Sequence, residues 1–275
     1  MDFAPRRASF RKLHEQGCFV MPNPWDPGSA RYLSGLGFPA LASTSAGFAF
    51  SRGLPDAAAF ASMDLVLSHI AEIVDATGLP VNADFENGYA DRPQDVANNV
   101  RRCVATGVAG LSIEDATGDP AQPLYDLPLA VERIRAAREA IDHSQSGVLL
   151  TARAECYLVN HPDPLAESLR RLEAYSRAGA DVLYAPGPRR ADEIATIVKT
   201  LAPKPVNLLM SVHTGLSVAD VAAFGVRRIS VGSSLARVAW TAFMKTAQEI
   251  AGQGTFTGFD GLVPYVDLNQ IFRSK

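Results

Sequence analysis

Short apolar runs alternate with longer amphipathic stretches along nearly the whole chain, a pattern typical of buried strands joined by helices. Strands are predicted near Cys18–Met21, Ala40–Ala42, from Val81, and near Val108–Ile113, Val148–Ala152, Asp181–Tyr184, Val206–Met210 and Arg228–Val231. Helices are predicted near Arg6–Gln16, Ser29–Leu36, Met63–Thr77, Asp91–Thr106, Leu129–Asp142, Pro164–Ala178, Asp192–Leu201, Val218–Phe224, Ser234–Gly252 and Pro264–Phe272. Continuous apolar strands with helical crossovers predict a parallel sheet covered by helices.

Four glycines mark the same kind of junction. Gly37, Gly107, Gly179 and Gly225 each follow a predicted helix and precede an apolar strand, as expected for residues that end a helix in the left-handed conformation. Eight strand–helix units in 275 residues predict an α/β fold, a (β/α)8 TIM barrel. A doubly wound sheet is the alternative, but no GxGxxG follows the first strand. We expect one domain over residues 1–275, with an N-terminal helix and a C-terminal helical extension over 253–275.

Composition and charge narrow the classes of partner. The chain is 47% hydrophobic and 20% charged, with a net charge of −3 and no Lys/Arg run longer than two. Nucleic acid is therefore not expected as a partner. The first residues lack the apolar segment of a secretory signal and no run is long enough to span a membrane, so we expect a cytoplasmic protein. Cys18, Cys103 and Cys156 have no CxxC spacing, which indicates free thiols.

Acidic side chains stand at the predicted ends of two strands. Asp84 and Glu86 are two positions apart, so they leave the same side of the strand if it stays extended that far. Glu114 ends the following strand, whose backbone would lie roughly 4.8 Å away. Three carboxylates at one rim favour a neutralising cation, and their oxygen atoms suit Mg²⁺ or Mn²⁺. The alternative is that each acid caps the following helix.

Polar residues also follow other strands, at the end where barrel enzymes have their active sites. The run 44–47, Thr-Ser-Ala-Gly, offers backbone N–H groups that could hold a carboxylate. Arg153 is either a structural counter-ion for the acids or a bidentate clamp on an anionic substrate, and we favour the clamp. The run 232–234, Gly-Ser-Ser, stands where many barrels bind phosphate, but a serine N-cap explains it better.

Three residues near these strand ends are given no chemical role. Asp115 directly follows Glu114 and should point away from it, so we interpret it as structural. Cys156 is interpreted as a packed thiol and His213 as a loop residue.

Several motifs, in this order, resemble the isocitrate lyase/phosphoenolpyruvate mutase superfamily over nearly the whole chain. They are Thr44-Ser45-Ala46-Gly47, Gly53-Leu54-Pro55-Asp56, Asp84-Phe85-Glu86-Asn87-Gly88-Tyr89, Ser112-Ile113-Glu114-Asp115 and Ala152-Arg153-Ala154-Glu155. The resemblance implies a Mg²⁺-dependent barrel that makes or breaks C–C or P–C bonds beside a 2-oxo acid, through a pyruvate enolate. It also implies a homo-oligomer, a tetramer whose last barrel helix is swapped between subunits.

The same resemblance implies roles for particular residues. Asp84, Glu86 and Glu114 would hold the metal directly or through water, with Asp56 in the same polar shell. Arg153 would contact the substrate. The carboxylate end of the substrate would lie against Thr44, Ser45 and Ala46.

This chain departs from the family pattern where other members carry their chemistry. Glu86 replaces an aspartate common in the family, and Ala185-Pro186 replaces the acid that lyases have after the sixth strand. The loop over 115–126 has no Cys, Lys or His. These departures argue against isocitrate and methylisocitrate cleavage and against the phosphonate reactions.

The remaining hypothesis is a lyase that acts on a small 2-oxo diacid, by decarboxylation of an oxaloacetate-like acid or by C–C cleavage. Arg153, Asp56 and Tyr125 are its predicted catalytic residues, with Asp119 as a second loop group to test. A P–C hydrolase or mutase acting on phosphonopyruvate is one alternative. A catalytically weak protein that binds 2-oxo dicarboxylates such as 2-oxoglutarate is another.

Overall fold

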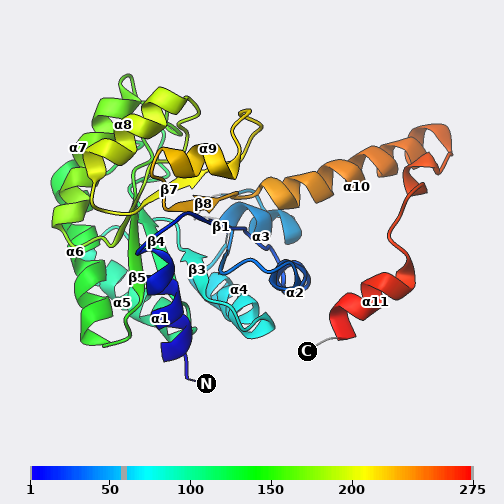
Figure 1. Ribbon diagram of the computed structural model, residues 1–275, viewed down its shortest axis with the longest axis horizontal. Helices are drawn as coiled ribbons and strands as arrows, with labels where there is room; N and C mark the ends of the chain where they lie inside the picture. The colour runs from blue at the N-terminus through cyan, green and yellow to red at the C-terminus, as the bar shows by residue number, and fades with distance from the viewer. Residues whose placement is uncertain (1, 57–60, 274–275) are drawn as a thin grey trace.

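Eight parallel strands form a nearly closed barrel in the computed structural model, which describes residues 2–56 and 61–273 (Figure 1). The hydrogen-bonded order is β1-β8-β7-β6-β5-β4-β3-β2, so the first and last strands are neighbours. The strands are β1 (Phe19–Met21), β2 (Leu41–Ala42), β3 (Val81–Asp84), β4 (Gly110–Glu114), β5 (Leu149–Arg153), β6 (Val182–Tyr184), β7 (Val206–Leu209) and β8 (Arg228–Ser230). The predicted (β/α)8 barrel is confirmed.

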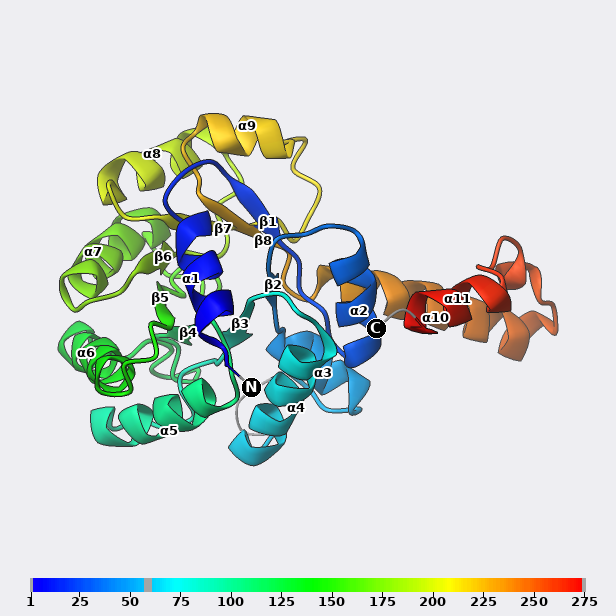
Figure 2. The same cartoon turned by 60° about the horizontal axis from the view of Figure 1, so that its bottom comes forward.

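Helices surround this barrel, and each strand is followed by at least one of them (Figure 2). They are α1 (Ala4–Leu13), α2 (Pro27–Gly35), α3 (Ser45–Ser51), α4 (Met63–Ala76), α5 (Pro93–Ala105), α6 (Leu127–His143), α7 (Pro164–Arg177), α8 (Ala191–Leu201), α9 (Val218–Ala223), α10 (Ser234–Gln253), the 3-10 helix η1 (Thr257–Phe259) and α11 (Tyr265–Arg273). Helix α3 was not predicted, because seven residues are too few to show helical periodicity.

The four predicted glycine junctions are confirmed. Gly37, Gly107, Gly179 and Gly225 have φ values of 83°, 93°, 103° and 88°, in the left-handed region that glycine adopts at low cost. Each glycine ends a helix and turns the chain toward the next strand.

Helix α1 covers the N-terminal end of the barrel (Figure 2). Phe10 on α1 is fully buried in a cluster with Phe19 of β1, Leu149 of β5 and Ala109, which directly precedes β4. Arg7 on the same helix donates hydrogen bonds to the carbonyls of Val108 and Val104, each at 3.0 Å. The ligand-accessible end of the barrel is therefore the opposite one.

Asn23, which follows β1, connects the ends of β2 and β8. In the part of the chain that the structure describes, no regular ladder joins β1 to β2, so this is the place where the barrel closes. Its Nδ2 donates to the Ser43 carbonyl at 2.8 Å, and its Oδ1 accepts from the backbone of Val231 and Gly232 at 3.0 and 2.9 Å. The Ala42 N–H donates to the Pro22 carbonyl at 3.0 Å between β1 and β2. One buried amide side chain thus replaces part of a regular ladder.

Helix α10 extends away from the barrel, and the chain then turns back so that α11 contacts α2 (Figure 1). Together α10 and α11 form an arm. The arm exposes many large apolar side chains: Val238, Trp240, Phe243, Met244, Phe256, Phe259, Leu262, Val263, Tyr265, Val266, Leu268 and Phe272. Exposed apolar surface of this extent is typical of interaction sites. Within the described residues, no helix combines the length and apolar character needed to cross a membrane.

Candidate active site

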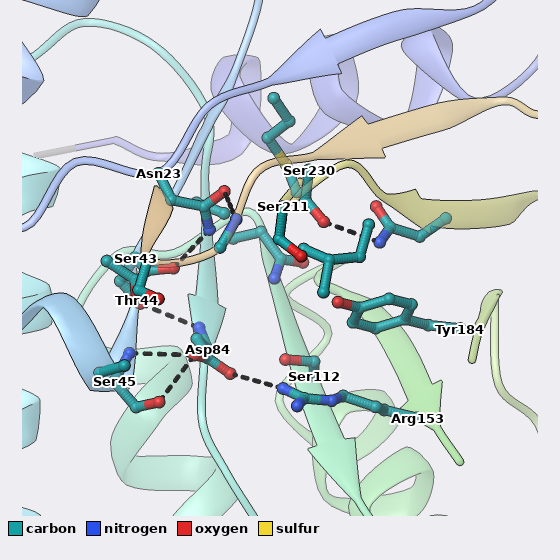
Figure 3. Close-up of a pocket in the computed structure, with 18 of the residues that line it drawn as sticks. Asn23, Ser43, Thr44, Ser45, Asp84, Ser112, Arg153, Tyr184, Ser211 and Ser230 are labelled. Carbon is teal, nitrogen blue, oxygen red and sulfur yellow. Dashed lines mark hydrogen bonds and ion pairs between the residues drawn. The ribbon is translucent and has the colours of Figure 1, made fainter. Parts of the chain in front are cut away.

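A cavity of about 260 Å³ opens at the C-terminal ends of the strands (Figure 3). Predicted site residues that line it are Thr44, Ser45, Ala46, Asp56, Asp84 and Arg153. Glu86, Glu114 and Tyr125 are not among the lining residues, although the charge of Asp84 adds to the effect of burial in raising the pKa of Glu86 and of Glu114. The rim of the barrel thus brings most of the predicted residues together.

Asp84 is fixed by the start of helix α3. Its Oδ2 accepts hydrogen bonds from the N–H and the hydroxyl of Ser45 at 2.9 and 3.0 Å (Figure 3). Thr44 is the N-cap of this helix, with its Oγ1 accepting from the Gly47 N–H at 3.2 Å. The Thr-Ser-Ala-Gly run therefore begins a helix, and the Ser45 N–H already has the carboxylate of Asp84 as its partner.

The chain turns sharply between Asp84 and Glu86, which corrects the expectation of an extended strand through both. Strand β3 ends at Asp84, and Glu86 has a φ of 43°. The turn closes with a hydrogen bond from the Gly88 N–H to the Phe85 carbonyl at 2.8 Å. The hydroxyl of Tyr89 donates to Glu86 Oε1 at 2.8 Å, and burial raises the pKa of Glu86 to about 7.

Arg153 is the cation among these acids. Its guanidinium lies 3.0 Å from Glu114 Oε2 and 3.5 Å from Asp84 Oδ1, and its Nε donates to Glu155. Burial alone would lower the pKa of Arg153, but the charges of Glu114 and Glu155 raise it well above its usual value. Its guanidinium also lies 5.3 Å from the centre of the Tyr184 ring. In this structure Arg153 occupies the position of a counter-ion for the acids. The sequence analysis had considered this role but had favoured a clamp on the substrate.

The acids around Arg153 are held in an environment that disfavours their charge. Burial raises the pKa of both Glu114 and Glu155, despite the opposing effect of Arg153. Within residues 2–56 and 61–273, no three Asp, Glu, His or Cys side chains lie close enough together to form a ready-made metal cage. Asp84 is the acid of the predicted trio that faces the cavity.

Asp56 and Tyr125 lie in different surroundings. Asp56 lines the cavity, where burial and the charge of Asp84 raise its pKa. Tyr125 is buried, and its hydroxyl donates to Asp91 Oδ1 at 2.5 Å and accepts from Asn87 Nδ2 at 3.2 Å. The structure therefore brings Asp56 to the candidate site, whereas Tyr125 does not line the cavity and is held by the segment that follows Glu86.

Asp115 has the structural surroundings expected of it. Its Oδ1 accepts from the Glu155 N–H at 2.8 Å, and its Oδ2 accepts from the Tyr175 hydroxyl at 2.6 Å and from Arg171 Nη1 at 3.1 Å. Arg171 also donates to the Tyr125 carbonyl at 2.9 Å. Asp115 therefore connects the ends of β4 and β5 to α7 and to the loop that carries Tyr125.

Other sequence interpretations are settled by the local geometry. Cys156 is fully buried and burial raises the pKa of its thiol to about 11, as suits a packed residue. His213 is exposed in a loop. Ser233 takes the N-cap position of α10 without a capping side-chain bond, and the Ser234 hydroxyl donates instead to the Ser211 carbonyl at 3.0 Å. The expected serine cap is therefore not formed.

Several cavity residues were not anticipated from the sequence. They lie deeper in the barrel and are Asn82, Ser112, Asn207, Arg228 and Ser230, with Arg237 at the start of α10. Asn82 and Ser112 precede Asp84 and Glu114 by two positions, so the side-chain alternation used to find the rim acids also points to them. The alternation does not point to Arg228, because the residue two positions after it was not predicted to be part of the site.

The barrel is parallel, and carboxylates cluster around one arginine at its C-terminal rim. These features are typical of an enzyme that acts on small organic acids. The chain belongs to the phosphoenolpyruvate phosphomutase family, whose model matches residues 10–251, and so to the isocitrate lyase/phosphoenolpyruvate mutase superfamily.

Similar proteins include both named enzymes and a protein identified only by class. A Burkholderia cenocepacia J2315 structure, described in general terms as a lyase/mutase, is 48% identical, with 98% of this chain and 96% of that chain covered and a TM-score of 0.93. The structure of oxaloacetate acetylhydrolase with its product oxalate is 30% identical, with 98% and 94% covered and a TM-score of 0.85. Oxaloacetate decarboxylase of Pseudomonas entomophila (strain L48) is 30% identical over 82% of this chain and 78% of its own length. Carbon–carbon bond cleavage is thus an activity of this family.

Proposed function

We propose that this protein is a divalent-metal-dependent carbon–carbon lyase that acts on a small 2-oxo diacid through a pyruvate-enolate intermediate. Decarboxylation or C–C cleavage of an oxaloacetate-like acid is the reaction that its residues suit best. The observation that carries the proposal is the rim of the cavity, where Asp84, Glu114 and Glu155 surround Arg153. The names of two relatives, oxaloacetate decarboxylase and oxaloacetate acetylhydrolase, support the same substrate class.

The acidic residues have the chemistry of a Mg²⁺ or Mn²⁺ site. Mg²⁺ usually binds through one or two carboxylates and keeps several waters, so it does not require a closed protein cage. Asp84 faces the cavity and suits a direct ligand, whereas Glu86 and Glu114 suit contacts through water. Burial is the main cause of the raised pKa values of Glu86 and Glu114, and the charge of Asp84 adds to it, so a bound cation would favour their charged forms. When bound, the metal would stabilise negative charge as it develops on the 2-oxo oxygen.

The protein's own residues would orient the substrate and the metal ligand. Ser45 fixes Asp84 through two hydrogen bonds, so this carboxylate does not need to reorganise on binding. Glu155 holds the guanidinium of Arg153 at the rim, where its charge would attract a substrate carboxylate. Thr44 and Ala46 line the wall next to Asp84, the predicted place of the carboxylate end. Tyr125 stays a predicted loop group whose role needs a direct test.

The first experiment measures pyruvate released from oxaloacetate in the presence of Mg²⁺. Wild type is compared with Asp84→Ala, with Asp192→Ala as a control on the exposed start of α8, and with a blank without enzyme. We expect wild type and the control to exceed the blank, and Asp84→Ala to lose roughly 100-fold or more of the enzymatic rate. The blank is needed because metal alone decarboxylates oxaloacetate.

Equal rates in all four samples would contradict oxaloacetate decarboxylation. Phosphate release from phosphonopyruvate would then support the P–C hydrolase alternative. Tight metal-dependent binding of 2-oxoglutarate without turnover, measured by calorimetry, would instead support the binding protein.

A further inference from the structure

The floor of the cavity differs from a usual barrel interior. TIM barrels are generally filled by layers of bulky branched residues. Here the deep wall of the cavity carries small or polar side chains from four strands: Asn82, Ser112, Asn207 and Ser230. Because these residues leave space where larger apolar ones would fill the barrel, the cavity continues below the rim acids.

Arg228 is the charged residue of this floor, and it has no acidic partner among the described residues. Its side chain is 1% exposed. Nε donates to Asn207 Oδ1 at 2.8 Å, Nη2 donates to Thr151 Oγ1 at 3.0 Å, and Nη1 lies 3.4 Å from His14 Nε2. These partners occupy three of the five N–H groups of a guanidinium, and all of them are neutral.

His14 cannot supply the missing negative charge. It comes from the end of α1, and its Nδ1 lies 2.8 Å from the Phe10 carbonyl, so Nδ1 carries the proton and Nε2 is the acceptor facing Arg228. Burial and the charge of Arg228 lower the pKa of His14 to about 3, which keeps the ring neutral. Burial also lowers the pKa of Arg228 to about 9, so the guanidinium stays charged at neutral pH.

Arg153 and Arg228, two of the three arginines that line this cavity, are therefore in opposite situations. Arg153 at the rim is surrounded by three carboxylates, whereas Arg228 on the floor has an uncompensated charge. A buried charge without a partner is costly, and an anion entering the cavity would supply that partner.

We propose that the cavity floor is an anion subsite built around Arg228, which binds the second carboxylate of a short diacid substrate. This inference rests on the proposed function for the identity of the ligand. The first acid group would lie at the rim near Asp84 and Arg153, and the second would point down the barrel axis. A cavity of about 260 Å³ is slightly below the usual range for drug-sized ligands, which suits a diacid of a few carbons.

The test uses metal-free protein in EDTA, so that binding does not depend on turnover or on the rim metal. Malonate, acetate and chloride are titrated separately, and affinity is measured by calorimetry and by the rise in melting temperature. Wild type is compared with Arg228→Met, which removes the charge, and with Asn207→Asp. The second variant is nearly isosteric, and it places a carboxylate at the atom that already accepts from Arg228. Asp192→Ala, at the exposed start of α8, serves as the control.

Malonate should bind wild type and Asp192→Ala with similar affinity. Arg228→Met and Asn207→Asp should each bind it roughly tenfold or more weakly, the effect of losing one charged hydrogen-bonded contact. Asn207→Asp retains the arginine and its acceptor at Oδ1, but loses the amide donor to Ser230. A cooperative unfolding transition like that of wild type, measured without ligand, would show that a loss of binding in this variant does not arise from misfolding. Unchanged malonate affinity in both variants would overturn the subsite. Equal affinity for chloride, acetate and malonate would overturn its assignment to a diacid.

The proposed function can fail separately from this subsite. If the protein does not turn over oxaloacetate, the malonate titration still decides whether Arg228 binds a diacid. If it does turn over, Arg228→Met should raise KM for oxaloacetate by roughly tenfold, with a smaller change in kcat. A loss confined to kcat would contradict a binding role.

Discussion

Arg153 and Arg228 show how the same residue type takes different roles according to its neighbours. The acids around Arg153 keep it charged and hold it at the rim, whereas neutral groups around Arg228 leave its charge open to a ligand. A sequence alone does not distinguish these situations, because most partners lie far away in the chain: Asp84 and Glu114 for Arg153, and His14, Thr151 and Asn207 for Arg228.

The buried His14 predicts a pH-dependent stability. The folded protein holds this imidazole with a pKa of about 3, against 6.5 for the free side chain, because of burial and the charges of Arg228, Arg11 and Arg227. Between these two pH values the unfolded chain binds more protons, so the free energy of unfolding falls as the pH is lowered from about 6.5 toward 3. This residue should contribute a slope of about 1.4 kcal/mol per pH unit.

Urea unfolding of wild type and His14→Gln at several values between pH 6 and pH 4.5 measures this contribution. We expect a shallower slope in His14→Gln than in wild type. His143→Gln, at the exposed end of α6, is the control and should retain the wild-type slope. Parallel slopes for all three proteins would show that His14 does not take up the proton on unfolding.

At the scale of elements, hydrophobic alternation predicted all eight strands and most helices, because apolar runs and helical faces are local properties of the chain. Helix α3 escaped prediction, since its first turn is held by Thr44 and by a contact from Ser45 to Asp84 on another strand. The turn at Glu86 escaped for a similar reason. Its left-handed backbone is unusual for glutamate, and the contact with Tyr89 that accompanies it is not visible from alternation.

The glycine junctions give a second prediction, based on a pair of equivalent positions. Gly37 and Gly107 both have left-handed backbones, so alanine should cost roughly 1–2 kcal/mol at either position. A Cβ at Gly37 would meet no atom within 4 Å, whereas one at Gly107 would lie 2.4 Å from Cζ of Phe3. Gly107→Ala should therefore destabilise the protein more than Gly37→Ala.

Denaturant unfolding of both variants, with and without Phe3→Ala, isolates this contact. The excess cost of Gly107→Ala should disappear in the Phe3→Ala background. An excess that persists there would mean that backbone strain, and not the phenyl ring, distinguishes the two junctions.

At the scale of the whole molecule, the arm of α10 and α11 exposes more apolar surface than a monomer would be expected to leave in contact with water. Phe243 is 61% exposed and Tyr265 is 85% exposed, and the other apolar residues of the arm continue this surface. We propose that the arm packs against a second copy of the chain, as the family resemblance implied for the last barrel helix. The mass in solution should then be a multiple of the monomer mass.

Light scattering after size-exclusion chromatography tests this assembly. Phe243→Asp places a charge on the apolar surface and should reduce the mass or make it depend on protein concentration. Gln248→Asp adds the same charge at an exposed polar position of α10 and should leave the mass unchanged. A wild-type protein that stays monomeric at high concentration would contradict the proposed packing.

The pairing of β1 with β8 also has a consequence for how the chain is made. Phe19 lies opposite Arg228, so the first strand receives its permanent neighbour only after most of the chain has left the ribosome. The strands from β2 to β7 pair in sequence order and can assemble as they emerge. The docking of α1 and β1 cannot be completed until β8 has been synthesised, because contacts of His14, Phe19 and Asn23 are made with residues beyond position 226. Ring closure is therefore a late, long-range event, and an interrupted synthesis would leave an open sheet with an unpaired edge.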